Sequence, residues 1–147
     1  MHFEGVFNVK APKEKVYAML LDPHQISQCM PDLQKLDVRS SDDFTVTVRA
    51  GVSFIKGDFT LHFAVVEKSA PTHAKLTAHG TGIGSTVDMD TVMDISDAQE
   101  GGTSMKWTAD AKVGGKVASL GQRLLDGQAE KIIRQLFECL QHRLEAA

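Results

Sequence analysis

Apolar residues near the end of the chain recur at three- or four-residue steps or at multiples of four. They are Val117, Leu120, Leu124, Ile132, Leu136, Leu140 and Leu144, and the stripe is widened on one side by Leu125, Ala129, Ile133 and Phe137. This spacing predicts one amphipathic helix from about 117 to 144, roughly 40 Å long at ~1.5 Å per residue. An apolar stripe of that length needs an equally long apolar partner, which we expect the preceding strands to supply.

From residue 33 to residue 113 the apolar period changes to two, which is the spacing of strands with one buried face. Six such strands follow one another through short polar turns and predict an antiparallel meander. Residues 2–9 alternate in the same way and add a strand at the amino end. The inward positions are Phe3, Phe7, Val46, Phe59, Phe63, Met89, Met93, Met105 and Trp107. Because the alternate positions are polar, we expect only one face of the sheet to be covered.

Two short helices are predicted between the first strand and the meander. Pro12 suits the first turn of a helix over about 12–21, and Asp22 is expected to cap a second helix that starts at Pro23 and is ended by Pro31. The element order therefore predicts an α+β fold, in which a curved seven-stranded antiparallel sheet wraps around a long C-terminal helix. A chain of 147 residues is long enough for a real core, and we expect a single domain.

Composition and charge narrow the classes of function. The net charge is -3 with acids and bases interleaved, so we expect no nucleic-acid partner. No run approaches the roughly 20 apolar residues of a membrane span, and the first residues lack a signal-peptide pattern. Cys29 and Cys139 have no C-x-x-C spacing, and two separate thiols in a reducing compartment are favoured over a disulfide. These features predict a cytoplasmic protein.

The sequence contains no evident catalytic or metal-binding motif. The glycine-rich stretch 80–85 lies between two strands rather than before a helix, so we interpret it as a hairpin and not as a phosphate-binding loop. Asp88, Asp90 and Asp94 alternate on the polar face of one strand and are interpreted as solvated. The histidines show no metal-ligand spacing, and no nucleophile motif occurs. We therefore expect no catalytic residue, no metal and no cofactor.

The apolar inner face leaves a filled core and a ligand cavity both open. A curved sheet closed by one helix can leave a gap, and apolar pockets commonly bind ligands. Methionines fill irregular space and suit either interpretation. Gly121 and Gly127 favour the cavity slightly, because each costs about 1 kcal/mol relative to Ala inside a helix and would permit a bend, a close approach or a ligand.

Three stretches resemble one known family. Residues 113–137, VGGKVASLGQRLLDGQAEKIIRQLF, are similar to the signature of the carbon monoxide dehydrogenase G subunit (CoxG) family, within the START-like, Bet v 1-like (SRPBCC) superfamily. Asp22-Pro23 with Cys29-Met30-Pro31 resembles its D-P…C-x-P-G pattern, and residues 52–59 resemble its G-P-I-K-G-x-F pattern, so the resemblance covers essentially the whole chain.

The departures from the family pattern are also specific. Asp32 stands where the family usually has Gly, and Ser53-Phe54 stands where it has Gly-Pro. Many relatives carry a C-terminal extension implicated in membrane attachment, whereas this sequence stops at Ala147. We therefore expect no membrane anchor, and we leave peripheral membrane contact and a homodimer open.

The resemblance implies a helix-grip fold with a deep hydrophobic cavity between the sheet and the long helix. It also implies a role beside molybdenum hydroxylases of the carbon monoxide dehydrogenase type, in maturation, membrane recruitment or supply of a lipophilic electron acceptor such as a quinone. The preferred hypothesis is a non-catalytic carrier of a quinone or lipid-like molecule. The alternatives are an assembly module without ligand and an enzyme acting on a hydrophobic substrate, for which the inward strand positions offer mainly Thr91 and Thr103.

The expected ligand site lies where three segments meet. Its entrance is placed between the loop 52–57, the corner near Met30 and Pro31, and the first half of the long helix. The expected lining residues are Met30, Phe54, Phe63, Met89, Trp107, Leu120 and Leu124.

Overall fold

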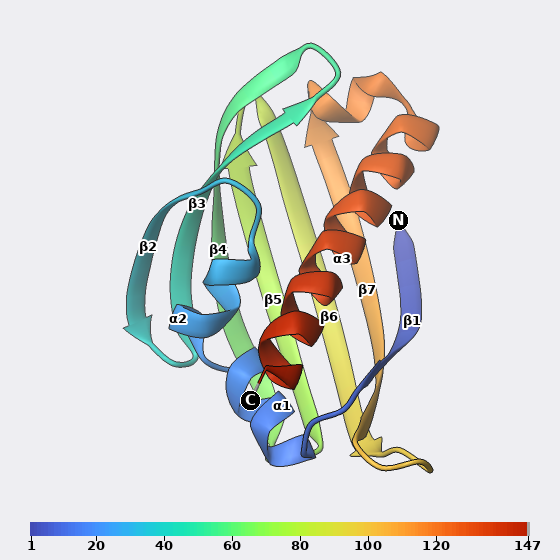
Figure 1. Ribbon diagram of the computed structural model, residues 1–147. Coiled ribbons are helices and arrows are strands. Elements are labelled where there is room, and N and C mark those ends of the chain that lie inside the picture. Colours follow the sequence, from blue (N-terminus) through green and yellow to red (C-terminus); the bar gives the residue numbers. More distant parts are fainter. Residues whose placement is uncertain (147) are drawn as a thin grey trace.

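The computed structural model describes residues 1–146, apart from the side chain at position 52, and contains one sheet with helices on one side (Figure 1). The strands are β1 (His2–Val9), β2 (Leu33–Ser40), β3 (Asp43–Val52), β4 (Ile55–Ser69), β5 (His73–Gly82), β6 (Ser85–Asp97) and β7 (Thr103–Gly115). The helices are α1 (Lys13–Leu20), α2 (Pro23–Ile26), the 3-10 turns η1 (Ser27–Cys29) and η2 (Val117–Leu120), and the long helix α3 (Gln122–Glu145).

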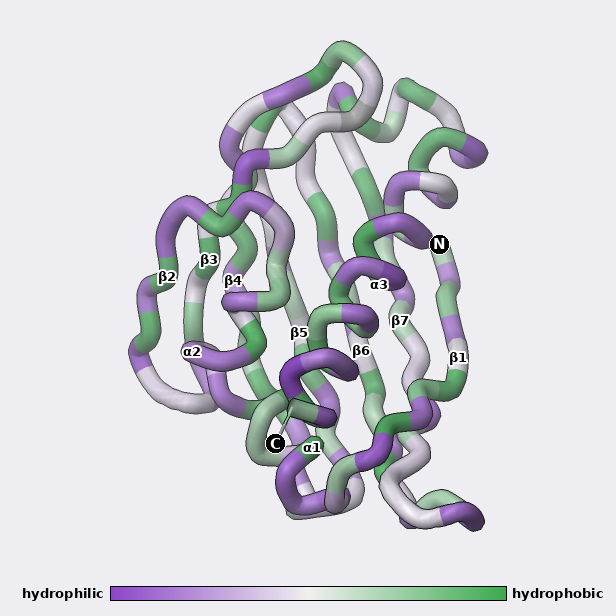
Figure 2. The backbone as a smooth tube through the Cα atoms, in the orientation of Figure 1, coloured by the Kyte–Doolittle hydropathy of each residue, from purple (hydrophilic) through white to green (hydrophobic). Residues whose placement is uncertain are grey.

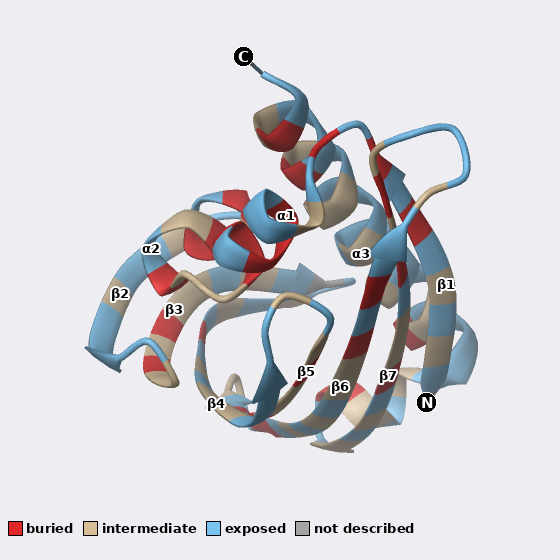
Figure 3. Cartoon of the chain, turned by 90° about the horizontal axis from the view of Figure 1, so that it is seen from below, coloured by how far each residue is buried: buried red, intermediate tan, exposed pale blue. Residues whose placement is uncertain are grey.

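The seven strands form one antiparallel sheet in the order β1-β7-β6-β5-β4-β3-β2. Strands β2 to β7 are a meander, and β1 closes the far edge by pairing with β7. The sheet curves around the helices, which all lie on its concave side (Figure 3). This architecture confirms the predicted α+β fold, including the two short helices between β1 and β2.

The strand register explains why one face is apolar. Phe44, Phe63, Ala78, Met89 and Ala111 pair in one continuous row across β3 to β7, and the rows on either side point the other way. A strand alternates its side chains between the two faces, so a period of two in the sequence gives an apolar concave face and a polar convex face. Figure 2 shows hydrophobic and hydrophilic positions alternating along α3 as well, as expected for a helix with one buried stripe.

The long helix begins later than the sequence predicts. Gly121 adopts φ 98° and ψ 152°, and separates η2 from α3, so the predicted helix from about 117 is a 3-10 turn followed by a break. A side chain at this φ would be strained, whereas glycine is not. Gly127 remains inside α3 with no atom within 4 Å of where a Cβ would lie, so it marks neither a bend nor a close approach.

The buried stripe of α3 is also displaced from the predicted one. Leu125, Leu140 and Leu144 are its buried residues, whereas Leu124 and Ile132 are 43% and 42% exposed. Positions 125, 140 and 144 fall within about a third of a turn at ~3.6 residues per turn, and position 124 lies on the opposite flank. Position 132 lies within about 20° of position 125, so the exposure of Ile132 comes from its place along the helix and not from its direction. The sequence pattern identified the helix correctly but placed the centre of its apolar stripe too close to Leu124.

The densest part of the core lies where the C-terminal turns of α3 meet α1 and the strand ends beside α1. Val16, Val46, Met105, Leu140 and Leu144 are each under 2% exposed. The ring of Phe137 stacks on Phe7 with centroids 4.9 Å apart. Within the described chain, the α3 residues that belong to or pack against this core cluster all follow position 135.

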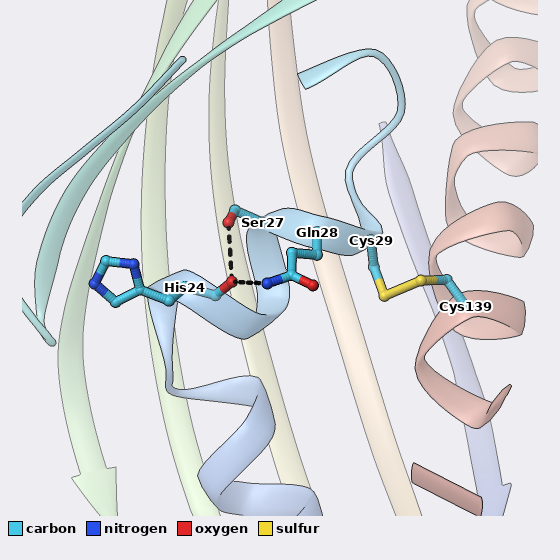
Figure 4. The surroundings of a disulfide bond; sticks show 5 residues. All are labelled: His24, Ser27, Gln28, Cys29 and Cys139. Atoms are coloured by element: carbon cyan, nitrogen blue, oxygen red, sulfur yellow. Dashed lines mark hydrogen bonds between the residues drawn. A yellow bond between two sulfur atoms is a disulfide. The ribbon is translucent and has the colours of Figure 1, made fainter. Parts of the chain in front are cut away.

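The two cysteines form a disulfide, so the prediction of two separate thiols is wrong. Cys29 at the end of η1 is bonded to Cys139 of α3, with a Cα–Cα distance of 5.6 Å (Figure 4). The two positions are 110 residues apart in sequence. Their spacing carried no information on the pairing, because the contact arises only when the short helices pack against α3.

Candidate functional site

The concave face opposite the first half of α3 is apolar but not fully covered. Leu61, Phe63, Leu76, Met89 and Trp107 all point inward and all keep intermediate exposure. Their neighbours on the same face nearer α1 are buried: Ala74, Met93, Ile95 and Met105. Inward side chains that remain accessible indicate solvent-reachable space on the concave side, which we call the inner-face gap.

Trp107 is held at the border between the dense core and the inner-face gap. Its indole packs against Gly5 of the paired strand β1, where a Cβ would stand 3.0 Å from its Cζ2 atom. The ring of Phe137 is 5.2 Å from the indole, centroid to centroid. Any residue larger than glycine at position 5 would displace the indole, so the pair Gly5 and Trp107 fixes the position of the largest aromatic group on this face.

The structure brings together three of the residues expected to line the cavity. Phe63 and Met89 lie in the same row of the concave face, and Trp107 lies on the same face of the neighbouring strand β7. Phe44 stacks on Phe63 with centroids 5.0 Å apart and supports it from β3. These residues form the floor of the inner-face gap.

The other four expected lining residues lie around this floor or outside it. Met30 follows η1 and is partly buried against the core cluster, and Leu120 ends η2 with intermediate exposure. Phe54 occupies the β3–β4 turn and is 81% exposed, and Leu124 faces outward from α3. The structure therefore does not bring Phe54 and Leu124 to the floor residues.

The buried hydroxyl groups on this side already serve the fold. Thr103 Oγ1 donates to the carbonyl of Ala11 at 2.6 Å, and Ser85 Oγ accepts from the Val117 amide at 2.9 Å. Ser27 Oγ donates to the carbonyl of His24 at 3.4 Å. Hydroxyls engaged in this way stabilise turns and strand ends and are not free to act on a substrate.

Tyr17 is a buried polar residue that the sequence pattern did not single out. Its side chain is 9% exposed, and its hydroxyl has no hydrogen-bond partner within residues 1–146. A buried hydroxyl without a partner costs free energy. The signal was present in the sequence, because Tyr17 stands next to Val16 and three residues before Leu20 on the buried side of α1.

The charged groups of the sheet are gathered on the convex face, away from the gap. Histidine–carboxylate pairs join neighbouring strands there: His2 with Asp110, His62 with Asp43, His73 with Asp94 and His79 with Asp88, at 2.6 to 2.7 Å. Hydrogen bonds to Asp94 and then to Glu67 raise the pKa of His73, and those to Asp110 and Glu4 raise the pKa of His2. Among the described residues, no three His, Cys, Asp or Glu side chains are placed to hold a metal ion.

Two surface hollows lie away from the inner-face gap. One is formed by the β1–α1 junction and the β6–β7 turn, with polar residues such as Lys13 and Asp97 on its walls. The other lies on the convex face around His79 and Asp88. Both are open to solvent and carry charged side chains beside apolar ones, so neither resembles an enclosed apolar site.

Comparison with known proteins identifies the family. The family model for the G subunit of carbon monoxide dehydrogenase (CoxG) matches residues 5–145. The chain belongs to the CoxG family. Within this CoxG chain, the disulfide joins Cys29 of the Cys29-Met30-Pro31 stretch to Cys139, which lies just beyond the stretch 113–137 that resembles the family.

Solved structures similar to this CoxG chain confirm the START-like fold. A conserved protein from Geobacillus kaustophilus is 29% identical, with 98% of this chain and 95% of that chain covered and a TM-score of 0.90. A START superfamily protein from Mycobacterium smegmatis is 13% identical, with coverage of 98% and 97% and a TM-score of 0.71. The Zhui aromatase/cyclase from Streptomyces sp. R1128 is 14% identical, with coverage of 99% and 93% and a TM-score of 0.70. No curated protein matches this sequence.

The positions at which this CoxG chain departs from the family pattern share one backbone feature. Asp32 and Ser53, which stand where the family has glycine, adopt φ angles of 52° and 58°. This left-handed region is free of strain for glycine and costs other residues energy. Glycine would suit both positions better, because it adopts these positive φ angles without the strain that Asp32 and Ser53 carry.

The longest helix, α3, carries charged side chains along its exposed side. Glu130, Lys131 and Arg134 are examples, all of them exposed. No helix formed by residues 1–146 is both long and apolar enough to cross a membrane.

Proposed function

We propose that this CoxG chain is a non-catalytic carrier that binds a lipophilic small molecule, a quinone or a lipid-like compound, in the inner-face gap. The observation that carries the proposal is the apolar concave face at Leu61, Phe63, Met89 and Trp107, which remains partly exposed although it points inward. Covering apolar surface contributes about 25 cal/mol per Å². An apolar ligand would gain this free energy, because α3 leaves the surface uncovered.

The proposed ligand rests on the floor residues Phe63, Met89 and Trp107. Met30 and Leu120 contact it from the corner and from η2, and Phe54 and Leu124 stand at the entrance. Methionine and aromatic side chains adapt to flat or irregular apolar groups, which suits a quinone ring or an acyl chain.

A non-catalytic role is supported by the chemistry of the inner face. The buried hydroxyls of Ser27, Ser85 and Thr103 are engaged in hydrogen bonds, and Thr91 is the other inward hydroxyl expected from the sequence. The likeness to an aromatase/cyclase at 14% identity concerns the fold alone. General acid–base or nucleophilic chemistry needs paired polar groups near the substrate, which the floor residues do not supply.

The partner proposed for this carrier is a molybdenum hydroxylase of the carbon monoxide dehydrogenase type. Family membership supports this partner, since the family is named as a subunit of that enzyme. Residues 1–147 would act as one domain that carries the ligand to or from it. A cytoplasmic location remains part of the proposal, although the pairing of Cys29 with Cys139 removes the support that separate thiols gave it.

Native mass spectrometry of the purified protein, followed by organic extraction, tests the proposal. A stoichiometric adduct that is extracted as a quinone or lipid is the expected result. An apo mass, without any thermal shift on addition of decylubiquinone or palmitate, would contradict the carrier. Co-purification of such an apo protein with the hydroxylase would favour an assembly module.

A further inference from the structure

The disulfide joins the turn η1, which directly precedes Met30, to the long helix α3. Cys29 ends η1 and is 5% exposed, and Cys139 lies in α3 with intermediate exposure. The segment 22–32, which we call the corner, lies between α3 and the β3 side of the sheet (Figures 1 and 4). The bond therefore ties the segment that leads to Met30, a proposed ligand contact, to α3.

Among the described residues, no other strong tie holds the corner to α3. The side-chain hydrogen bonds of the corner are local: those of Ser27 and Gln28 go to the carbonyl of His24, and that of Gln25 goes to Asp22. The end of the corner is held to the sheet by the Arg49 amide, which donates to the carbonyl of Asp32 at 2.9 Å. Within residues 1–146, no hydrogen bond or ion pair joins residues 22–31 to α3, so apolar packing and the disulfide hold them together.

Cys139 lies in the part of α3 that is packed into the core, so the disulfide ties the corner to a firmly held helix. The turns of α3 from Leu136 to Leu144 belong to or pack against the dense core cluster. This packing holds α3 in place independently of the corner. Of the corner, Ile26 and Cys29 belong to the same cluster, and within residues 1–146 no hydrogen bond joins residues 22–31 to α3. Breaking the bond should therefore loosen the corner more than it loosens α3.

We propose that Cys29 and Cys139 form a redox-operated latch on the inner-face gap. The disulfide holds the corner against α3 and slows the exchange of the ligand, and the reduced pair lets the corner move and speeds exchange. This inference rests on the proposed carrier function, which supplies the ligand that is exchanged.

The switching step is a thiol–disulfide exchange with a dithiol reductant. A thiolate of the reductant attacks Sγ of Cys139, the more accessible sulfur, and forms a mixed disulfide while Cys29 leaves as a thiolate and takes up a proton. The second thiol of the reductant then attacks the mixed disulfide, releases Cys139 as a thiol and becomes a disulfide with its partner. Two electrons and two protons pass from the dithiol to the protein, and the reverse exchange with an oxidised dithiol closes the latch.

Ligand exchange measured in both redox states tests the latch. The probe is 11-(dansylamino)undecanoic acid, which is not redox-active, and energy transfer from Trp107, the single tryptophan, reports its binding and release in stopped flow. The protein is reduced with dithiothreitol, which is then removed without air. We expect release of the probe to be about tenfold faster from the reduced protein. Equal release rates in the two states would overturn the latch.

A variant without the disulfide provides the matched control. The double variant C29A/C139A should release the probe as fast as the reduced protein, and treatment with dithiothreitol should leave its rate unchanged. A rate in C29A/C139A that equals that of the oxidised protein would contradict the latch. If this variant does not fold, the comparison of oxidised and reduced wild type still decides.

Hydrogen exchange separates a failure of the latch from a failure of the carrier. Reduction should raise amide exchange in residues 22–32 by about tenfold and leave β4 to β6 unchanged. Absence of probe binding in both redox states would contradict the carrier proposal, and the release of the corner is then judged by hydrogen exchange alone. Unchanged exchange in the corner would overturn the latch whether or not the probe binds.

Discussion

At the scale of single residues, close contacts decide which side chains fit on the concave face. Gly80 of β5 lies beneath Phe59 and Leu61, and a Cβ at this position would stand 2.6 Å from Leu61 Cδ2 and would also collide with the Phe59 ring. Gly127 of α3 has the opposite surroundings, with open space where a Cβ would lie. A side chain is therefore excluded by close packing at Gly80 and is not excluded at Gly127.

Substitution of each of these glycines by alanine should shift stability in opposite directions. Gly80→Ala is expected to lower the free energy of unfolding by about 1–3 kcal/mol, because Phe59 and Leu61 must move. Gly127→Ala is expected to raise it by about 1 kcal/mol, because alanine favours the helix and meets no atom. Urea unfolding followed by circular dichroism measures both values. A stabilising Gly80→Ala would contradict the packing described for β4 and β5.

Removal of the buried Tyr17 hydroxyl tests whether that group serves the fold. Tyr17→Phe is expected to leave the free energy of unfolding unchanged or to raise it by up to about 1 kcal/mol, because a hydroxyl without a partner is removed. The same change should leave the affinity for decylubiquinone unaltered, because Tyr17 lies in the dense core and not at the inner-face gap. Urea unfolding and isothermal titration calorimetry measure the two quantities. A destabilised variant would show that the hydroxyl has a partner in the folded protein.

The raised pKa of His73 makes the convex face sensitive to pH. Asp94 and Glu67 hold the protonated ring, so the folded pKa lies above the ordinary value of 6.5. The resulting stabilisation is fully present below about pH 6.5 and is lost as the pH rises through the folded pKa. In an NMR titration, Asp94→Asn should lower the His73 pKa, and Asp90→Asn on the same strand should leave it in place. An unaltered pKa in Asp94→Asn would contradict the pairing.

At the scale of elements, turns and breaks carry the features that the periodicity did not predict. Alternation identified every strand because the two faces of each strand differ so clearly in polarity. The start of α3 was missed because an apolar stripe continues across Gly121, whose backbone angle breaks the helix. The disulfide was missed because its partners meet only through tertiary packing, which no local spacing reports.

The turn before β2 offers a direct test of the left-handed backbone. Asp32→Gly should raise the free energy of unfolding by about 0.5–1 kcal/mol, since glycine adopts a φ of 52° without strain but loses more entropy on folding. Asp37→Gly, in the extended backbone of β2, is the control and should lower the free energy of unfolding by about 0.5–1 kcal/mol. Thermal or urea unfolding measures the difference. The same sign for both variants would contradict the assigned backbone angle.

At the scale of the whole molecule, the two ends of the helix–sheet sandwich differ. The end with α1 and the last turns of α3 is tightly packed, whereas the concave face opposite the first half of α3 keeps partly exposed apolar side chains. That Phe63, Met89 and Trp107 share the concave face could be predicted from strand alternation alone. Phe54 and Leu124 could not be placed, because their orientation depends on a turn and on the exact start of a helix.

The central claim is that a lipophilic ligand occupies the inner-face gap, and a pair of alanine substitutions tests it most directly. Ala111 of β7 lies on the concave face in the row of Met89, and Ala64 of β4 lies on the convex face opposite Thr77. Titration of decylubiquinone, followed by quenching of Trp107 fluorescence, measures the affinity of each variant. We expect Ala111→Phe to fill the gap and weaken binding about tenfold, or ~1.4 kcal/mol, and Ala64→Phe to bind like wild type. Equal affinity of both variants, or no saturable quenching in the wild type, would contradict the account.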